Sequence, residues 1–328
     1  METARKYLIK LCIPVSLVIS FLFLSCTASF LGESETRWRV AGTSTGPTRL
    51  ELENAAYSGF EGIEEIKGPV RLIDGKWEGP AYTRDSAVRP VLNLLGDFII
   101  TGDLNGDGSD DSVTVLNLST GGTGQLFYIA VVGRISGAVR NVGTKFIGDR
   151  VQIRGGRING RAVFLDVVRA GPSDAACCPG EIATIGWTFE PGGMLAPVIV
   201  TDKPGRLSLQ TIAATEWVLR KWTWNEAAPA DPPITIQFRD GQFVGSGGCN
   251  RYFAPAKEGV LAGDVSTGPI GATRMSCNEQ TMAAEQRYFA QLSGIKKFGF
   301  MLGRLALTYE TEGRWGVMLF EERDPRAQ

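Results

Sequence analysis

The sequence predicts a mainly β protein with two domains. Short runs rich in Val, Ile and Thr recur along the chain, and 41 glycines favour turns and strands over long helices. A length of 328 residues is enough for two units, each with its own core. A Pro/Gly break, Lys203-Pro204-Gly205, predicts a linker at 201–210 between a β-rich domain at 47–200 and a second domain at 211–322. Residues 323–328 are a tail.

The first 25 residues have the pattern of a signal peptide. A cationic start is followed by the apolar run from Leu11 to Leu24, which is short for a permanent membrane span. The run ends in Leu22-Phe23-Leu24-Ser25-Cys26. This resembles the lipobox of bacterial lipoproteins and implies lipidation of Cys26. Phe23 stands where that pattern prefers Leu, so secretory cleavage near Ala28 or a retained anchor stay open as alternatives.

Lipidation at Cys26 predicts a protein of the cell envelope. Acyl chains hold a protein on a membrane because each buried methylene contributes roughly 0.8 kcal/mol. Thr27, rather than Asp, follows the cysteine, which by resemblance to enterobacterial sorting favours the outer membrane over the inner one. Residues 26–46 are polar and without periodicity, and we interpret them as a tether.

Composition excludes several functions. The chain contains no histidine, which removes Ser-His-Asp and Cys-His catalysis and His-ligated zinc. A net charge of −1 gives no indication of a nucleic-acid partner. Beyond Cys12 and Cys26 there are four cysteines, an even number that suits disulfides in an oxidising compartment.

The first domain has an antiparallel pattern of short strands separated by Asp-Gly, Asn-Gly and Gly-Gly turns. The predicted strands are Val70–Ile73, Phe98–Thr101, Ser112–Leu118, Leu126–Val132, Arg150–Ile153, Ala162–Val168 and Thr184–Phe189.

An acidic loop in this domain has the spacing of a calcium site. Side-chain oxygens recur at alternate or near-alternate positions, with a glycine at the sixth position, so they can converge on one cation. The candidate ligands are Asp103, Asn105, Asp107, Ser109 and Asp111. The loop resembles those of dockerins and FG-GAP repeats and implies a structural Ca²⁺. The alternative is a hairpin turn with solvated acids.

Cys177-Cys178-Pro179-Gly180 lies in a turn-rich segment. Three outcomes stay open here: a vicinal disulfide, pairing with Cys249 or Cys277, or reduced thiols.

The second unit begins at Trp217 and contains one helix candidate, Asn278 to Leu292. Asn278 is its N-cap and Gly294 its stop, and Met282, Phe289 and Leu292 form the apolar stripe. The predicted strands around it are Ile234–Phe238, Gln242–Gly245, Phe298–Met301, Arg304–Tyr309 and Trp315–Phe320.

Two cysteine-bearing blocks carry a family resemblance. They are Gly248-Cys249-Asn250-Arg251-Tyr252-Phe253 and Gly271-Ala272-Thr273-Arg274-Met275-Ser276-Cys277, followed by Glu285 and by Trp315-Gly316-Val317-Met318-Leu319-Phe320. Their order resembles the META (HslJ-like) domain over residues 211–322. The resemblance implies an α+β domain of curved antiparallel sheet with one packed helix, a link to envelope stress and drug tolerance, and no enzymatic activity.

The same blocks allow two interpretations of their side chains. Cys249 and Cys277 favour a disulfide, with buried thiols or a redox or metal pair as alternatives. The polar neighbours form either a binding surface or a hydrogen-bonded turn network; they are Asn250, Arg251, Thr273 and Arg274.

We therefore expect a non-catalytic envelope lipoprotein that contributes to envelope integrity or stress tolerance by binding. An inhibitor or chaperone-like protein binder is the alternative, using aromatic anchors such as Trp222, Trp224, Tyr252 and Phe253. A carboxylate-based hydrolase is a weaker rival.

Overall fold

The computed structural model describes residues 46–60, 62–64, 66–175, 177–190, 195–198, 200 and 204–324. The predicted signal peptide, Cys26 and nearly all of the tether lie outside these residues. In the described ranges, every helix is too short or too polar to cross a membrane. All strand pairs between the named strands are antiparallel, which confirms the predicted mainly β fold.

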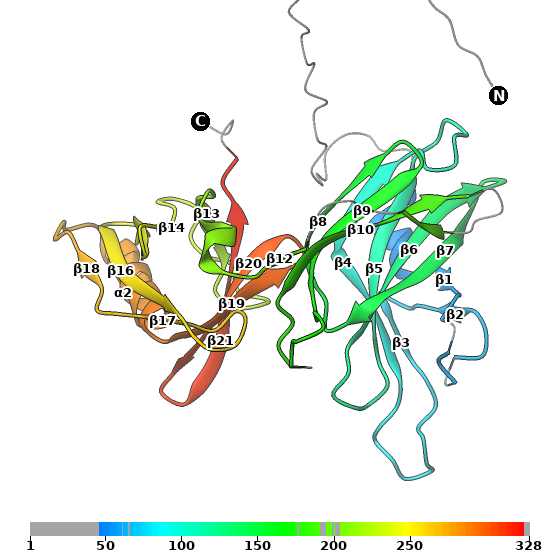
Figure 1. The fold of residues 1–328 in the computed structure, drawn as a ribbon, viewed down its shortest axis with the longest axis horizontal. Coiled ribbons are helices and arrows are strands. Elements are labelled where there is room, and N and C mark those ends of the chain that lie inside the picture. Colours follow the sequence, from blue (N-terminus) through cyan, green and yellow to red (C-terminus); the bar gives the residue numbers. More distant parts are fainter. Residues whose placement is uncertain are drawn as a thin grey trace, which may run out of the picture. The chain divides into compact units, whose positions relative to one another are not determined.

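The first domain contains two five-stranded sheets (Figure 1). One runs in the order β3-β4-β5-β6-β7, and the other β11-β10-β9-β8 with β12 paired to β10. The first sheet consists of β3 (Lys76–Glu78), β4 (Val91–Gly102), β5 (Asp111–Ser119), β6 (Leu126–Ile135) and β7 (Ala138–Asp149). The second consists of β8 (Gln152–Asn159), β9 (Ala162–Arg169), β10 (Glu181–Phe189), β11 (Leu195–Val198) and β12 (Gly205–Arg206).

Both faces of the first sheet are covered. Val113 and Val115 of β5 pack with Ile153 and Leu165 of the second sheet in one core. On the other face, residues of β5 pack against α1 (Arg49–Glu53), β1 (Ala56–Tyr57) and β2 (Val70–Arg71). Cover on both faces explains why burial along β5 is nearly continuous rather than alternating, and it includes the polar side chains of Asp111, Ser112 and Thr114.

The second half of the described chain contains a sheet ordered β17-β16-β15-β14-β13-β21-β20-β19, with β18 paired to β16. Its strands are β13 (Trp217–Lys221), β14 (Thr235–Arg239), β15 (Gln242–Ser246), β16 (Arg251–Glu258), β17 (Val265–Thr267), β18 (Gly271–Ala272), β19 (Ile295–Met301), β20 (Arg304–Thr311) and β21 (Arg314–Glu322). The amide of Phe298 donates to the Gly263 carbonyl at 2.7 Å, next to an Asp264–Lys297 bridge. These contacts join β19 to the segment before β17 and nearly close a barrel.

The longest helix in the described ranges, α2 (Glu279–Ser293), begins and ends where predicted. The Asn278 side chain accepts a hydrogen bond from the Thr281 amide at 2.9 Å, and Gly294 follows the last turn. Its buried face differs from the predicted stripe. Leu292 is buried as predicted, whereas Met282 is 44% exposed. Glu285 and Tyr288 are buried as well, where they bond to Asn250 and Tyr252.

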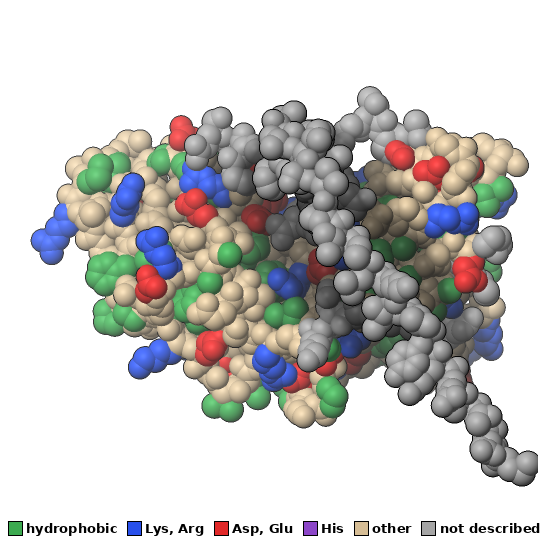
Figure 2. Space-filling model, turned by 45° about the horizontal axis from the view of Figure 1, so that its top comes forward, with side chains coloured by type: hydrophobic (Ala, Val, Ile, Leu, Met, Phe, Trp, Pro, Cys, Tyr) green, Lys and Arg blue, Asp and Glu red, His purple; other side chains and the backbone are tan. Residues whose placement is uncertain are grey.

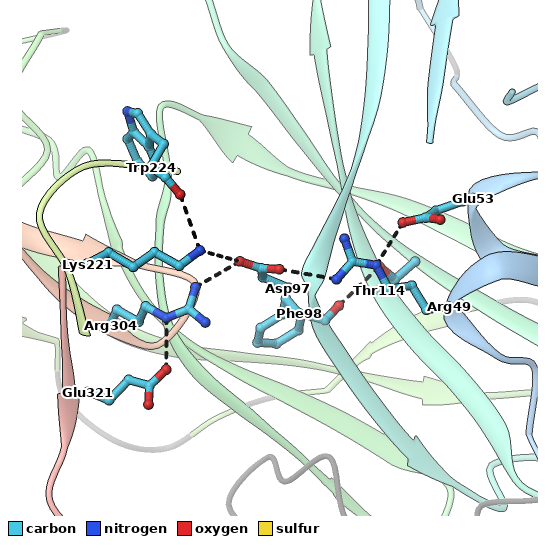
Figure 3. Close-up of polar contacts among 9 residues, drawn as sticks. All are labelled: Arg49, Glu53, Asp97, Phe98, Thr114, Lys221, Trp224, Arg304 and Glu321. Carbon is cyan, nitrogen blue, oxygen red and sulfur yellow. Dashed lines mark hydrogen bonds and ion pairs between the residues drawn. The ribbon is translucent and has the colours of Figure 1, made fainter. Parts of the chain in front are cut away.

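The two halves are in direct contact. The strand β12 falls inside the predicted linker and pairs with β10, and Leu207 packs with Val168 in the core of the second half. The side chain of Asp97 in β4 lies among three cations (Figure 3). They are Arg304 at 2.9 Å, Arg49 at 3.4 Å and Lys221 at 3.9 Å.

Candidate functional site

A disulfide and a carboxylate organise the polar centre of the second half. Cys249 and Cys277 lie at disulfide distance, with their Cα atoms 5.9 Å apart. Beside them, Glu285 Oε2 accepts a hydrogen bond from the Asn250 amide at 2.6 Å, and Oε1 accepts one from Asn250 Nδ2 at 2.8 Å. Gly247 leaves room for this carboxylate, because a Cβ there would lie 2.6 Å from Oε2. Helix α2 is thereby fixed to the turn before β16.

The four predicted surface residues separate into two roles. Asn250 is buried, and its Oδ1 accepts hydrogen bonds from Thr273 Oγ1 at 2.8 Å and from the Met275 amide at 2.7 Å. Thr273 Oγ1 also accepts from the Arg251 amide at 3.2 Å. This part is the turn network, while the Arg251 and Arg274 side chains are exposed. The network fixes the backbone from which Arg251 projects.

Arg251 lines an open groove of about 550 Å³. Its other lining residues come from β14 and β15 and from flanking segments: Glu216, Pro232, Pro233, Thr235, Gln237, Arg239, Val244, Gly245, Ser246, Tyr252 and Arg323. The alternation of side chains along β14 explains which of its residues form the floor of the groove. Ile236 and Phe238 of β14 enter the core, so Gln237 and Arg239 face outwards.

The groove carries a net positive charge. Arg323 Nη1 pairs with both carboxylate oxygens of Glu216, at 3.0 and 3.1 Å. In contrast, neither Arg239 nor Arg251 has an ion pair with any residue in the described ranges. Figure 2 shows Lys and Arg side chains spread over the left-hand part of the surface, the part that Figure 1 assigns to β14 to β18. Two unneutralised guanidinium groups therefore face solvent across the groove.

The predicted calcium loop is organised by its own carboxylates. Asp103 Oδ1 accepts from the Gly106 and Asp107 amides, at 2.6 and 3.1 Å, and its Oδ2 accepts from the Gly108 amide at 2.9 Å. Asp107 Oδ1 accepts from the Ser109 amide at 2.8 Å. In the part of the chain that the structure describes, no three acidic or cysteine side chains converge as a metal cluster.

Asp111 differs from the other acids of this loop because it is buried. Its Oδ2 accepts from the Leu104 amide at 3.1 Å. Burial raises the pKa of the Asp111 carboxyl, and the negative charges of Asp107 and Asp103 act in the same direction. The loop thus brings the negative charges of Asp103, Asp107 and Asp111 near one another.

The remaining cysteines lie in a loop of the first domain. Cys177 and Cys178 pair with each other, the vicinal outcome among the three predicted. The loop is held by Asp174, which accepts from the Gly171 and Gly180 amides, each at 2.8 Å, and pairs with Arg206. The hydrogen bond from the Gly171 amide contributes most to lowering the pKa of Asp174. Arg206 and the Gly180 amide lower it further. Lys297 Nζ lies 3.7 Å from Cys178 Sγ.

Sequence reasoning missed Arg239, Gln237 and Arg323 of the groove. The signal for two of them was the alternation Thr235-Ile236-Gln237-Phe238-Arg239, which places Gln237 and Arg239 on one face. The four aromatic side chains considered as binding anchors fall into a buried pair and a half-exposed pair. Trp222 and Tyr252 are in the core, and Trp224 and Phe253 are about half exposed.

The second half is thus a small α+β domain, with a nearly closed antiparallel sheet, one packed helix and a basic groove on the sheet. Residues 210–322 match the family model of the META domain, so the chain contains a META domain at its C-terminal end. This confirms the META part of the resemblance drawn from the two cysteine blocks.

The comparisons with curated proteins and with solved structures add little to this assignment. No curated protein matches the chain. Among solved structures, the NMR structure of a protein from Burkholderia xenovorans is similar at 22% identity and a TM-score of 0.27, covering 39% of this chain and 96% of that one.

Proposed function

We propose that this chain is a non-catalytic binding protein of the cell envelope, anchored by lipid at Cys26, with the groove of the META domain as its binding site. The observation that carries the proposal is the pair Arg239 and Arg251, which project into an open groove without an ion pair to any described residue. Exposed arginines without a protein counter-charge are suited to an external anionic group.

Two further observations support binding rather than catalysis. The chain has no histidine to act as a general base near neutral pH. The buried carboxylate nearest to the groove, Glu285, uses both oxygens to hold Asn250. A carboxylate engaged in this way positions backbone rather than reacting with a substrate. The proposed role is a contribution to envelope integrity or stress tolerance.

The proposal includes a structural calcium ion in the loop at 103–111. The support is the group of Asp103, Asp107 and Asp111, whose mutual repulsion a divalent cation would relieve. The carboxylates accept backbone hydrogen bonds and do not converge on one point. Calcium binding therefore has to draw them closer together. Asn105 and the Ser109 carbonyl are the remaining candidate ligands.

A complementation experiment tests the envelope role. A strain lacking the gene is compared under detergent and antibiotic stress after receiving the wild-type gene, Cys26→Ser, the Arg239→Gln/Arg251→Gln double variant, or Arg314→Gln. Arg314 is the matched control, because its side chain is 82% exposed on the β20–β21 hairpin and lies outside the groove. We expect only the wild type and Arg314→Gln to restore growth.

Two results would count against the proposal. Full rescue by the Arg239→Gln/Arg251→Gln double variant would remove the groove from the function. Mass spectrometry that finds Cys26 without acyl groups in the mature protein would remove the lipid anchor.

A further inference from the structure

The spacing of the two arginines sets the size of the ligand. Arg239 is opposite Gln242 in β15, and Arg251 is opposite Ser246 in the same strand. The two positions therefore differ by four residues along the strand, about 13 Å, and by two strand spacings, about 10 Å. The α-carbons of Arg239 and Arg251 are thus about 16 Å apart. A chain with repeated anionic groups can pair with both arginines while their side chains point away from each other.

The floor of the groove argues against an extended peptide. Peptides that bind sheets typically add a strand and use the unpaired backbone groups of an edge. Here the floor is a sheet face, in which β15 is hydrogen-bonded to β14 on one side and to β16 on the other. The edge of β16 beside the groove is itself paired with β18. Across β14 to β16 the groove consequently offers mainly side chains as binding groups, while the outer edge of β14 is paired with β13 only at Thr235 and Ile236.

The side chains on this face match the chemistry of sugars. The Gln237 side chain has no hydrogen-bond partner among the described residues, so its amide can donate to and accept from hydroxyl groups. It lies opposite Val244, and Val244 lies opposite Phe253 on β16.

Phe253 adds an aromatic surface next to the groove. The residue is 52% exposed, and its ring packs on Gly271, where any Cβ would come within 2.5 Å of ring atoms. The absence of a side chain at Gly271 thus allows the Phe253 ring to pack against β18. An exposed flat ring beside hydrogen-bonding side chains can stack on the apolar C–H face of a sugar.

We propose that the groove binds an anionic polysaccharide, a sugar chain carrying carboxylates, with Arg239 and Arg251 each pairing with one carboxylate and Phe253 stacking on a sugar between or beside them. This inference rests on the proposed function, because it names the ligand class of the same groove. It adds Phe253 and Gln237 to the site.

The test uses the purified full chain in a neutral detergent and isothermal titration with three probes: polygalacturonate, neutral dextran and poly-L-glutamate. We expect binding to polygalacturonate only. Because loss of one charge-assisted contact is a substantial part of such binding, Arg239→Gln or Arg251→Gln weakens it about tenfold. Phe253→Ala weakens it by a similar factor, and Arg314→Gln leaves it unchanged. All four positions are exposed, and thermal melts of the variants check that the fold is intact.

The outcomes separate the alternatives. Stronger binding of poly-L-glutamate, unaffected by Phe253→Ala, would overturn the polysaccharide in favour of an acidic protein segment. An equal loss from Arg314→Gln would show diffuse charge attraction and overturn the site. If polygalacturonate does not bind while Arg239→Gln/Arg251→Gln still fails to restore growth, the polysaccharide is wrong and the groove keeps its proposed function.

Discussion

Glu285 holds Asn250 with both of its carboxylate oxygens, one on the backbone amide and one on the side-chain amide. Asn250 in turn accepts from Thr273 and Met275, so one helix residue organises two distant turns. The arrangement stabilises the domain because the two Asn250 donors are buried and would otherwise lack a partner.

Glu285→Gln should destabilise the protein by about 2 kcal/mol. A glutamine side chain has one acceptor oxygen, so one of the two Asn250 donors would face an NH₂ group. The free energy of unfolding in urea measures this effect. Glu312→Gln is the control, because that side chain is 83% exposed, and it should change stability little. Equal stability of Glu285→Gln and wild type would show that the network is not stabilising.

Removing the Cys249–Cys277 disulfide should cost about 3.5 kcal/mol, from the chain entropy of a closed loop of this size. The sequence separation is 28 residues. Cys249→Ala/Cys277→Ala is therefore expected to lower the urea midpoint. Cys177→Ser/Cys178→Ser is the matched pair, since adjacent residues close no loop. A larger loss from the second variant would contradict the loop-entropy explanation.

Asp97→Asn should lower the free energy of unfolding at neutral pH by about 1 kcal/mol. This value already takes into account that solvent screens the partly exposed ion pairs. Burial opposes ionisation of Asp97, but the hydrogen bond from Arg304 and the charges of Arg304, Lys221 and Arg49 outweigh it and lower the pKa. A carboxyl whose folded-state pKa is lowered stabilises the protein fully above its unfolded pKa of about 3.9. This contribution is lost as pH falls through the folded-state pKa.

The difference in unfolding free energy between wild type and Asp97→Asn should therefore be constant from neutral pH to about pH 5 and shrink below about pH 4. Urea titrations at several pH values measure it. Asp85→Asn removes an exposed carboxylate that makes no ion pair within the described ranges and should have little effect at any pH. A difference that grows as the pH is lowered would contradict the assignment.

Calcium should raise the melting temperature by a few degrees at about 10 mM, roughly tenfold above a Kd on the order of 10⁻³ M. Asp103→Asn/Asp107→Asn should abolish the rise, because it removes two carboxylate ligands. Magnesium at the same concentration is a control for ionic strength. An unchanged wild-type melting temperature would mean that the loop is a turn with solvated acids.

Local patterns in the sequence predicted the elements that local physics determines. Asn278 and Gly294 marked the ends of α2 because capping depends on neighbouring residues alone. The strand β7 was missed because its polar and partly exposed residues follow no apolar alternation. Residues of the groove were missed for a different reason: Arg239 and Arg323 are far apart in the sequence and meet only through sheet order.

Leu207 and Leu209 both precede residue 210, the first residue of the META match, yet both belong to the META core together with Val168 of the other half. The sequence match begins at residue 210, whereas the packed core of the domain includes residues before it. The two boundaries consequently differ. A META sequence transplanted from another protein at residue 210 would lose two leucines and expose Val168. An intact META core in this protein therefore requires Leu207, Leu209 and Val168 in addition to the matched residues.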